Sequence, residues 1–240
     1  MTVILPAAGK GSRLNLPYPK EILRINEDKA LIDFSFDLFD TVSRHQVEFV
    51  VVINEEKTEI VRYLAKYKNR FDISFIYQKP DSFEYTGAIK SAKYLFSENN
   101  LVLLPDTLLT LPKRFNLLQT VEQRLQNHEF TFLVKPETNK KMLKTKGCLQ
   151  LDKNMCVVAY EDKPSNNLSR FNGYWCGFAF KQEAFDQSID FMEQSTLRAL
   201  HHHTLLENTP IFKSSCIEIK DFKDLGTWDE ITKFLSQQKA

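Results

Sequence analysis

The amino-terminal stretch reads Thr2-Val3-Ile4-Leu5-Pro6-Ala7-Ala8-Gly9-Lys10-Gly11-Ser12-Arg13-Leu14. Its apolar beginning predicts a first β-strand that runs into a small, basic loop. The small residues leave backbone N–H groups open to an oxygen-rich ligand, and Lys10 and Arg13 add positive charge beside them. An average chain of this length would hold about 17 glycines. This chain holds 7 and places two of them here. The stretch therefore predicts a phosphate-binding loop.

Two common phosphate-binding motifs do not fit this loop. The dinucleotide motif Gly-x-Gly-x-x-Gly needs a glycine where Leu14 stands, and the motif Gly-x-x-x-x-Gly-Lys-Ser/Thr is also absent. What remains is Gly-x-Gly-x-Arg, followed by Pro19-Lys20-Glu21. A tight turn after a strand would explain Gly-x-Gly alone. The preceding alanines, Arg13 and the Pro-Lys pair favour the binding of phosphate.

The composition excludes several kinds of partner. Lys plus Arg number 32 and Asp plus Glu number 31, so the net charge of +1 gives no reason to expect nucleic acid or a membrane surface. No run of about 18 apolar residues occurs, and the amino terminus has no signal-peptide pattern.

The four cysteines contain no Cys-x-x-Cys pair, which predicts reduced packing residues in a cytoplasmic protein rather than disulfides or a zinc site. They are Cys148, Cys156, Cys176 and Cys216.

Apolar runs alternate with amphipathic segments through the first half of the chain. Strands are expected at 47–53, 73–77 and 101–104, and helices at 55–67 and 88–96. This alternation predicts an α/β fold of three layers, in which a mixed, mostly parallel sheet carries helices on both faces. In such folds, ligands bind beyond the carboxyl ends of the strands, where Leu5 and Leu104 stand.

The second half has shorter elements, and no linker, repeat or low-complexity segment interrupts it. The patterns predict two strands within 147–160, strands at 172–180 and 211–219, and helices at 185–206 and 227–235. We expect a single domain over 1–240, with halves 1–110 and 111–240. The histidines His201 to His203 fall in a predicted helix, where neighbours point about 100° apart and cannot converge on one metal ion. Trp175 and Trp228 are expected to pack.

Two aspartates are candidate metal ligands. Asp106 directly follows an apolar strand at the expected ligand edge of the sheet, although Pro-Asp could equally form a turn. Asp224 precedes Gly226 and Thr227, and Thr227 is a good N-cap for the final helix. Asp224 either shapes this turn or pairs with Asp106 on one metal ion.

Two further segments place charged or small residues near strand ends. Glu161, Asp162 and Lys163 end the second strand of 147–160, where they are either solvated or bind a ligand. Gln78 and Thr86-Gly87 frame a loop before a helix. Thr86 and Gly87 could cap this helix or let a flat nucleobase approach the backbone.

Taken together, these segments resemble the sugar-phosphate nucleotidylyltransferases, in particular the glucose-1-phosphate thymidylyltransferase type, over nearly the whole chain. The chain departs from the family pattern at Ala7-Ala8, where Gly-Gly is usual, at Pro105, which replaces glycine, and at Asp162, which replaces glutamate. The matching segments are Gly9-Lys10-Gly11-Ser12-Arg13-Leu14, Pro19-Lys20-Glu21, Thr86-Gly87-Ala88, Pro105-Asp106, Lys146-Gly147, Glu161-Asp162-Lys163-Pro164, 172–180 and Asp224-Leu225-Gly226-Thr227.

The resemblance implies the nucleotide-diphospho-sugar transferase fold, which is GT-A-like and of Rossmann type. It implies a cytoplasmic, Mg²⁺-dependent enzyme of carbohydrate biosynthesis that transfers a nucleotidyl group from an NTP, dTTP or UTP, to a sugar 1-phosphate. An NDP-sugar and pyrophosphate are the implied products. No nucleic acid or membrane partner is implied, and a homo-oligomer is compatible with the resemblance. Two alternatives stay open: a cytidylyltransferase acting on a non-sugar phosphate, and a non-catalytic nucleotide-binding module of the same fold.

The resemblance also implies a role for each matching residue. The implied catalytic residues are Arg13, Lys20, Asp106 and Lys163. Nucleotide contacts are implied for Leu5, Ala7, Ala8, Gly9, Lys10, Gly11, Ser12, Gln78, Thr86 and Gly87. Sugar contacts are implied for Gly147, Glu161, Asp162 and Gly177, and Mg²⁺ is assigned to Asp106 and Asp224.

Overall fold

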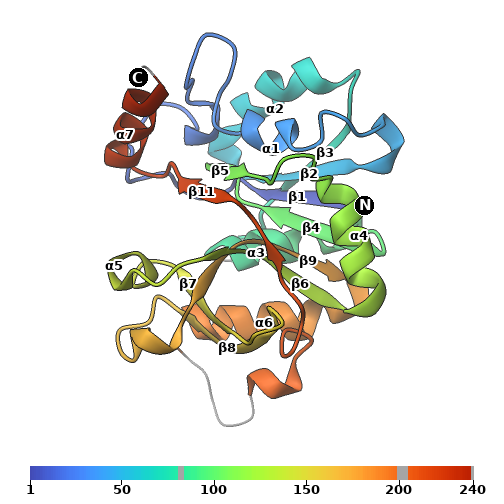
Figure 1. Cartoon of the computed structure of the whole chain (residues 1–240). Helices are drawn as coiled ribbons and strands as arrows, with labels where there is room; N and C mark the ends of the chain where they lie inside the picture. The colour runs from blue at the N-terminus through green and yellow to red at the C-terminus, as the bar shows by residue number, and fades with distance from the viewer. Residues whose placement is uncertain (81–83, 199–204, 239–240) are drawn as a thin grey trace. The chain divides into compact units, whose positions relative to one another are not determined.

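The computed structural model describes residues 1–80, 84–198 and 205–238 of the chain (Figure 1). The chain divides into two compact units. The first comprises residues 1–96, 102–110 and 221–240, and the second comprises residues 97–101 and 111–220. Residues 221–240 thus group with the first unit, whereas the sequence placed them in the second half. The prediction of a single domain stays a prediction.

The first unit is built on strands in the order β4-β1-β2-β3. Pairs β1–β2 and β2–β3 are parallel, with Leu5 opposite Val51 and Val51 opposite Phe75. Its strands are β1 (Thr2–Pro6), β2 (Glu48–Ile53), β3 (Asp72–Tyr77), β4 (Asn99–Leu103), β5 (Thr107–Thr110) and β11 (Asp221–Asp224). Its helices are α1 (Asp33–Asp37), α2 (Glu59–Leu64), α3 (Glu84–Ser91) and α7 (Trp228–Gln238), with short 3-10 turns η1 (Lys20–Ile22), η2 (Arg44–Gln46), η3 (Glu55–Lys57), η4 (Ala65–Tyr67) and η5 (Lys93–Leu95). Strand β4 begins in the second unit and ends in the first.

Helices cover both faces of β1 to β3 (Figure 1), with α1 and α2 on one face and α3 on the other. Continuous apolar runs such as Val3-Ile4-Leu5 are fully buried, as expected for parallel strands covered on both sides. The aromatic ring of Phe36 in α1 stacks on Phe49 of β2 at 4.1 Å and on Tyr67 at 4.4 Å. This aromatic cluster fastens α1 to the sheet.

The carboxyl-terminal segment is part of the first unit because β11 pairs with β5 in antiparallel register. Helix α7 follows, and its Ile231 and Phe234 join a core cluster with Leu14 and Leu225. Helix α7 is thereby packed against the residue that closes the glycine loop.

The second unit has strands in the order β10-β6-β9, and β7 pairs with both β9 and β8. The β6–β9, β7–β8 and β7–β9 pairs are antiparallel, and β10–β6 is parallel. Helix α4 packs on β6 and β9, and α6 packs on β8. The strands are β6 (Phe130–Pro136), β7 (Gly147–Leu151), β8 (Val157–Asp162), β9 (Gly173–Lys181) and β10 (Ile217–Glu218). The helices are α4 (Leu117–Asn127), α5 (Lys140–Leu143) and α6 (Phe185–Thr196), with 3-10 turns η6 (Leu168–Arg170), η7 (Gln182–Ala184) and η8 (Leu206–Asn208).

The predicted α/β class with a mixed sheet and helices is confirmed, but several predicted elements differ. The helix expected at 55–67 is divided into η3, α2 and η4, and the strand expected at 211–219 is reduced to β10. The helix expected at 185–206 ends at Thr196, and residues 199–204, which include His201 to His203, lie outside the described residues. No element was predicted between 111 and 146, where α4, β6 and α5 lie.

Among the described residues, no helix has the length and apolar character needed to cross a bilayer. Of the four cysteines, Cys148, Cys176 and Cys216 are buried, and Cys156 is half-buried. Burial raises the pKa of the Cys148 and Cys216 thiols to about 12. These thiols are therefore protonated at neutral pH and serve as packing groups.

The substitution Phe36→Ala should destabilise the protein strongly, because the removed ring is fully buried between two aromatic neighbours. Loss of a core aromatic costs about 3–5 kcal/mol. Denaturant unfolding followed by circular dichroism measures this change. Tyr94, which is 81% exposed, is the matched control, and Tyr94→Ala should change stability by less than about 0.5 kcal/mol. An equal effect of both substitutions would contradict this description of the core.

Candidate active site

The glycine loop begins where β1 ends. The Ala7 amide still donates to the Val52 carbonyl at 2.8 Å, and no amide of residues 8–13 donates to another described residue. A Cβ at Gly9 would meet nothing within 4 Å, so the loop is open there. Gly11 has a φ of +66°, a left-handed conformation that favours glycine. The predicted loop residues Ala8, Gly9, Lys10, Gly11 and Ser12 thus present backbone amides that have no acceptor among the described residues, as an anion site requires.

Lys20 and Asp106 form an ion pair near this loop. Lys20 lies in η1, and its Nζ donates to Asp106 Oδ2 at 2.5 Å. Both side chains are largely buried. Burial lowers the pKa of Lys20, but the attraction and hydrogen bond of Asp106, together with the attraction of Glu21, outweigh burial, and the net result is a raised pKa. Lys20 is therefore a permanent cation at neutral pH, held by a carboxylate that follows β4.

Asp106 and Asp224 approach each other because β5 pairs with β11. Thr107, the residue after Asp106, lies opposite Asp224 in the register, and the Leu225 amide donates to the Asp106 carbonyl at 3.0 Å. Three charged groups surround the point that a Cβ at Gly226 would occupy: Asp224 Oδ1 at 3.0 Å, Arg13 Nη2 at 3.1 Å and Asp106 Oδ2 at 3.4 Å. The structure thus brings together Arg13, Lys20, Asp106 and Asp224, all predicted from sequence.

The two carboxylate oxygens near Gly226 suit a magnesium ion only when a bound substrate supplies further oxygens. Among the described residues, no group of three or more His, Cys, Asp or Glu side chains could hold a metal ion. Mg²⁺, however, is usually bound by one or two carboxylates plus substrate phosphates and water. The converging oxygens of Asp106 and Asp224 fit this pattern, with the phosphates supplied by a bound nucleotide.

Trp228 has a different role from the packing role expected from sequence. Its side chain is 47% exposed, and its indole Nε1 donates to the Leu14 carbonyl at 3.0 Å. Thr227 Oγ1 accepts a long hydrogen bond from the Glu230 amide at 3.4 Å, as a residue that begins the final helix does. The start of α7 is therefore tied to the end of the glycine loop.

The residues expected to contact a base are placed differently from the sequence prediction. Helix α3 begins at Glu84, so Thr86 and Gly87 lie inside its first turns and do not cap it. Both are buried. Gln78 follows β3, and its backbone amide donates to the Ile53 carbonyl at 2.8 Å. Gln78 is therefore fixed by its backbone at the carboxyl ends of β2 and β3, and base contact by these three residues stays a prediction.

The second unit gathers most of the residues expected to bind a sugar. Gly147 lies opposite Asp162 in the β7–β8 pair, and the Lys163 amide donates to the Lys146 carbonyl at 3.0 Å. Lys163 has a φ of +46°, and its ammonium lies 3.9 Å from Asp162 Oδ2. Glu161 accepts a hydrogen bond from Arg170 at 2.8 Å. A lysine and two carboxylates thus meet at the end of one strand pair.

Two glycines of this unit are in different environments. A Cβ at Gly147 would lie 1.9 Å from Trp175 Nε1, so the indole packs directly on the glycine. Gly177 lies opposite Leu133 in β9, beside a bulge at which Val134 pairs with Trp175. A bulge changes the direction of the side chains around it. The indole explains the glycine at 147, whereas contact of Gly177 with a sugar stays a prediction.

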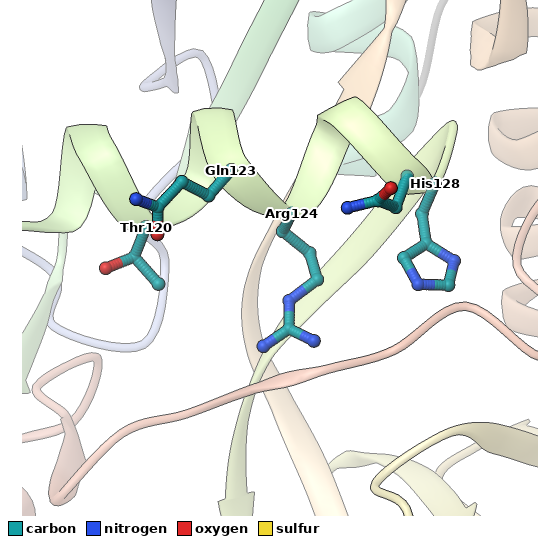
Figure 2. A pocket seen from close by; sticks show the side chains of 5 residues that line it. Thr120, Gln123, Arg124 and His128 are labelled. Atoms are coloured by element: carbon teal, nitrogen blue, oxygen red, sulfur yellow. The ribbon is translucent and has the colours of Figure 1, made fainter.

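A small pocket of the second unit contains none of the predicted site residues. Figure 2 shows four of its lining residues: Thr120, Gln123 and Arg124 on α4, and His128 directly after this helix. Asn127 completes the lining, and the cavity has a volume of about 210 Å³. Arg124 Nη1 donates to the Ser215 hydroxyl. Burial and the Arg124 guanidinium lower the pKa of His128. The pocket is a polar hollow on one helix rather than part of the candidate site.

Sequence reasoning missed Asn54 and Lys57 beside the glycine loop, and it named Glu21 only as part of the Pro19-Lys20-Glu21 segment, without a role of its own. Asn54, Lys57 and Glu21 make buried or half-buried polar contacts with the loop and with one another. A single signal was available, because Asn54 stands at the start of an acidic turn and caps it through the Glu56 amide. The contacts themselves join distant parts of the sequence and have no local pattern.

Comparison with known proteins defines the class of this protein. Residues 1–239 match the family described as nucleotidyl transferase, and the chain belongs to that family. The search of curated proteins gives no match.

Solved structures share the fold at low sequence identity. A UDP-glucose pyrophosphorylase complexed with UDP-glucose is 17% identical, with a TM-score of 0.74, and covers 99% of this chain and 98% of its own. A UTP-bound UGPase from Acinetobacter baumannii is 16% identical, with a TM-score of 0.73 and coverages of 99% and 92%. A Bacillus anthracis protein assigned as a glucose-1-phosphate thymidylyltransferase, solved with sucrose, is 15% identical, with a TM-score of 0.73 and coverages of 98% and 94%. The predicted family and fold are confirmed.

The substitution Gly147→Ala should destabilise the second unit, because the new methyl group would overlap the Trp175 indole. Overpacking of this kind costs about 1–3 kcal/mol. Denaturant unfolding measures the loss. Gly9→Ala is the control, because its methyl group would enter open space, and its free energy of unfolding should stay close to wild type. Wild-type stability of Gly147→Ala would show that the indole does not pack on this glycine.

Proposed function

We propose that the chain transfers a nucleotidyl group from an NTP, dTTP or UTP, to a sugar 1-phosphate, giving an NDP-sugar and pyrophosphate. The observation that carries the proposal is the arrangement at Gly226, where Arg13 and two carboxylates approach one point and Lys20 is bound to Asp106. These groups lie in the same unit as the open glycine loop. The names of the solved structures with this fold support a nucleotide and a sugar as substrates.

The first unit would bind the triphosphate. The loop amides and the planar Arg13 guanidinium would hold the β- and γ-phosphates, which depart as pyrophosphate. The ammonium of Lys20 has three donors, so it can keep its bond to Asp106 and also donate to the α-phosphate. A sugar phosphate oxygen would attack the α-phosphorus in line. Catalysis would then consist of positioning and charge neutralisation by fixed cations.

Asp106 and Asp224 would hold Mg²⁺ together with the phosphates. When bound, this ion neutralises charge on the reacting phosphates. The two carboxylates would otherwise repel the triphosphate, and Arg13 and Lys20 balance them only in part once the nucleotide is present. A divalent cation is therefore an expected requirement of the site.

The second unit would bind the sugar 1-phosphate. The Lys163 side chain is 60% exposed, and its ammonium would anchor the phosphate of this substrate. Glu161, Asp162 and the backbone at Gly147 would contact sugar hydroxyls. Gln78 and Gly87 of the first unit would contact the base, and the cytoplasmic location and a homo-oligomer stay predictions.

The substitution Asp106→Asn should keep the fold and lower turnover by about 100-fold or more, because it removes a metal ligand and the partner charge of Lys20. Pyrophosphate release measures turnover. The control is Asp221→Asn, at the other end of β11, where turnover should not change. Activity of Asp106→Asn close to wild type would remove this residue from the proposed site.

Removal of divalent cations with EDTA should abolish pyrophosphate release, and added Mg²⁺ should restore it. The assay pairs five NTPs with a panel of sugar 1-phosphates and with non-sugar phosphates. We expect release with dTTP or UTP and a sugar 1-phosphate, in the presence of Mg²⁺ only. Release with CTP and a non-sugar phosphate would indicate a cytidylyltransferase, and nucleotide binding without release would indicate a non-catalytic module.

A further inference from the structure

A buried ion pair lies beneath the glycine loop and takes no direct part in the proposed chemistry. Lys57 is 4% exposed and Glu21 is 1% exposed. The Lys57 ammonium donates to both carboxylate oxygens of Glu21 at 2.8 Å and to the Ala7 carbonyl at 2.7 Å. Burial raises the pKa of Glu21 and lowers that of Lys57, and the attraction between them opposes both shifts. A buried pair is weak evidence of added stability, because desolvation offsets the attraction.

The contacts of this pair determine the direction of the loop amides. Lys57 holds the Ala7 carbonyl, and Asn54 Nδ2 holds the Ala8 carbonyl at 2.8 Å. In a planar trans peptide, the carbonyl of one residue and the amide of the next point in opposite directions. The amides of Ala8 and Gly9 therefore point away from Lys57 and Asn54, and no described residue accepts from them. A Cβ at Gly9 would meet nothing within 4 Å, so the space beside this residue is open.

The other end of the pair is joined to the reacting groups. Glu21 directly follows Lys20 in η1, and Lys20 is bound to Asp106. Charges therefore alternate from Lys57 through Glu21 and Lys20 to Asp106. Lys57 is thus connected on one side to the carbonyl that begins the loop and on the other to the segment that carries Lys20.

We propose that Lys57 and Glu21 are positioning residues that hold the amides of the glycine loop and the ammonium of Lys20 in the one arrangement that binds a pyrophosphate group. The inference rests on the proposed function and deepens it, because neither side chain would touch the substrate. The buried pair is retained for the geometry of the site rather than for stability.

Two variants separate positioning from stability. Lys57→Met leaves the Glu21 carboxylate buried without its partner and should destabilise the protein. The double variant Lys57→Met with Glu21→Met replaces the pair by unbranched apolar side chains of similar length and should regain much of this stability. Neither variant restores the donor to the Ala7 carbonyl. Both should therefore bind inorganic pyrophosphate with Mg²⁺ at least tenfold more weakly than wild type, as measured by calorimetry.

Lys66→Met is the matched control. Lys66 is ion-paired with the fully buried Asp33 in the same unit, at 2.7 Å, and has no contact with the loop. This variant should lose stability without losing affinity for pyrophosphate. A double variant that regains stability and binds pyrophosphate as wild type does would overturn the proposal, because the pair would then be structural only.

A measurement on the wild-type protein keeps the proposal testable if the variants do not fold. Titration with inorganic pyrophosphate and Mg²⁺ should shift the amide resonances of Ala8 and Gly9 in a ¹⁵N–¹H spectrum. Binding that leaves both resonances unchanged would overturn the inference alone. Absence of pyrophosphate binding by the wild type, together with absence of pyrophosphate release, would overturn the proposed function as well.

Discussion

The antiparallel pairing of β11 with β5 is the contact on which the candidate site depends. It places Asp224 beside the residue that follows Asp106, and it turns the chain at Gly226 so that Arg13 reaches the same point. Trp228 then binds the Leu14 carbonyl and ties the following helix to the glycine loop. Without this pairing, the second carboxylate and the loop would have no fixed relation. A site that binds a metal ion and a triphosphate needs the second carboxylate and the glycine loop in a fixed arrangement.

Near the glycine loop, the buried charges of the first unit occur as ion pairs of opposite sign. Lys20 is held by Asp106, and Lys57 is held by Glu21. Fixed charges of this kind need little reorganisation when a charged substrate arrives, which is the physical basis of electrostatic catalysis. The cost is desolvation, and each buried ion here is offset by a partner at hydrogen-bond distance. The arrangement suits a reaction in which the protein positions phosphates and performs no covalent step.

The local parts of this site were predictable from sequence, whereas its long-range contacts were not. Gly9, Gly11 and Arg13 stand out because a glycine-poor chain concentrates small and basic residues after a strand. Asp106 stands out because it ends an apolar run. The Lys57–Glu21 pair joins distant segments through side chains, and no periodicity or motif marks such a contact. The strand expected at 211–219 shrinks to Ile217–Glu218, because residues before it bond to the β8 segment through Ser214 and Ser215 instead.

The central claim is that the α-phosphate of a nucleotide moves to a sugar phosphate, and isotope tracing tests it most directly. The protein is incubated with Mg²⁺, a sugar 1-phosphate and an NTP labelled at the α-phosphate, and the products are separated. The account predicts that the label appears in an NDP-sugar, only when the sugar 1-phosphate is present, while the β- and γ-phosphates leave together as pyrophosphate. Label that stays in the unreacted nucleotide with every NTP and sugar 1-phosphate, or release of the γ-phosphate as inorganic phosphate, would contradict it.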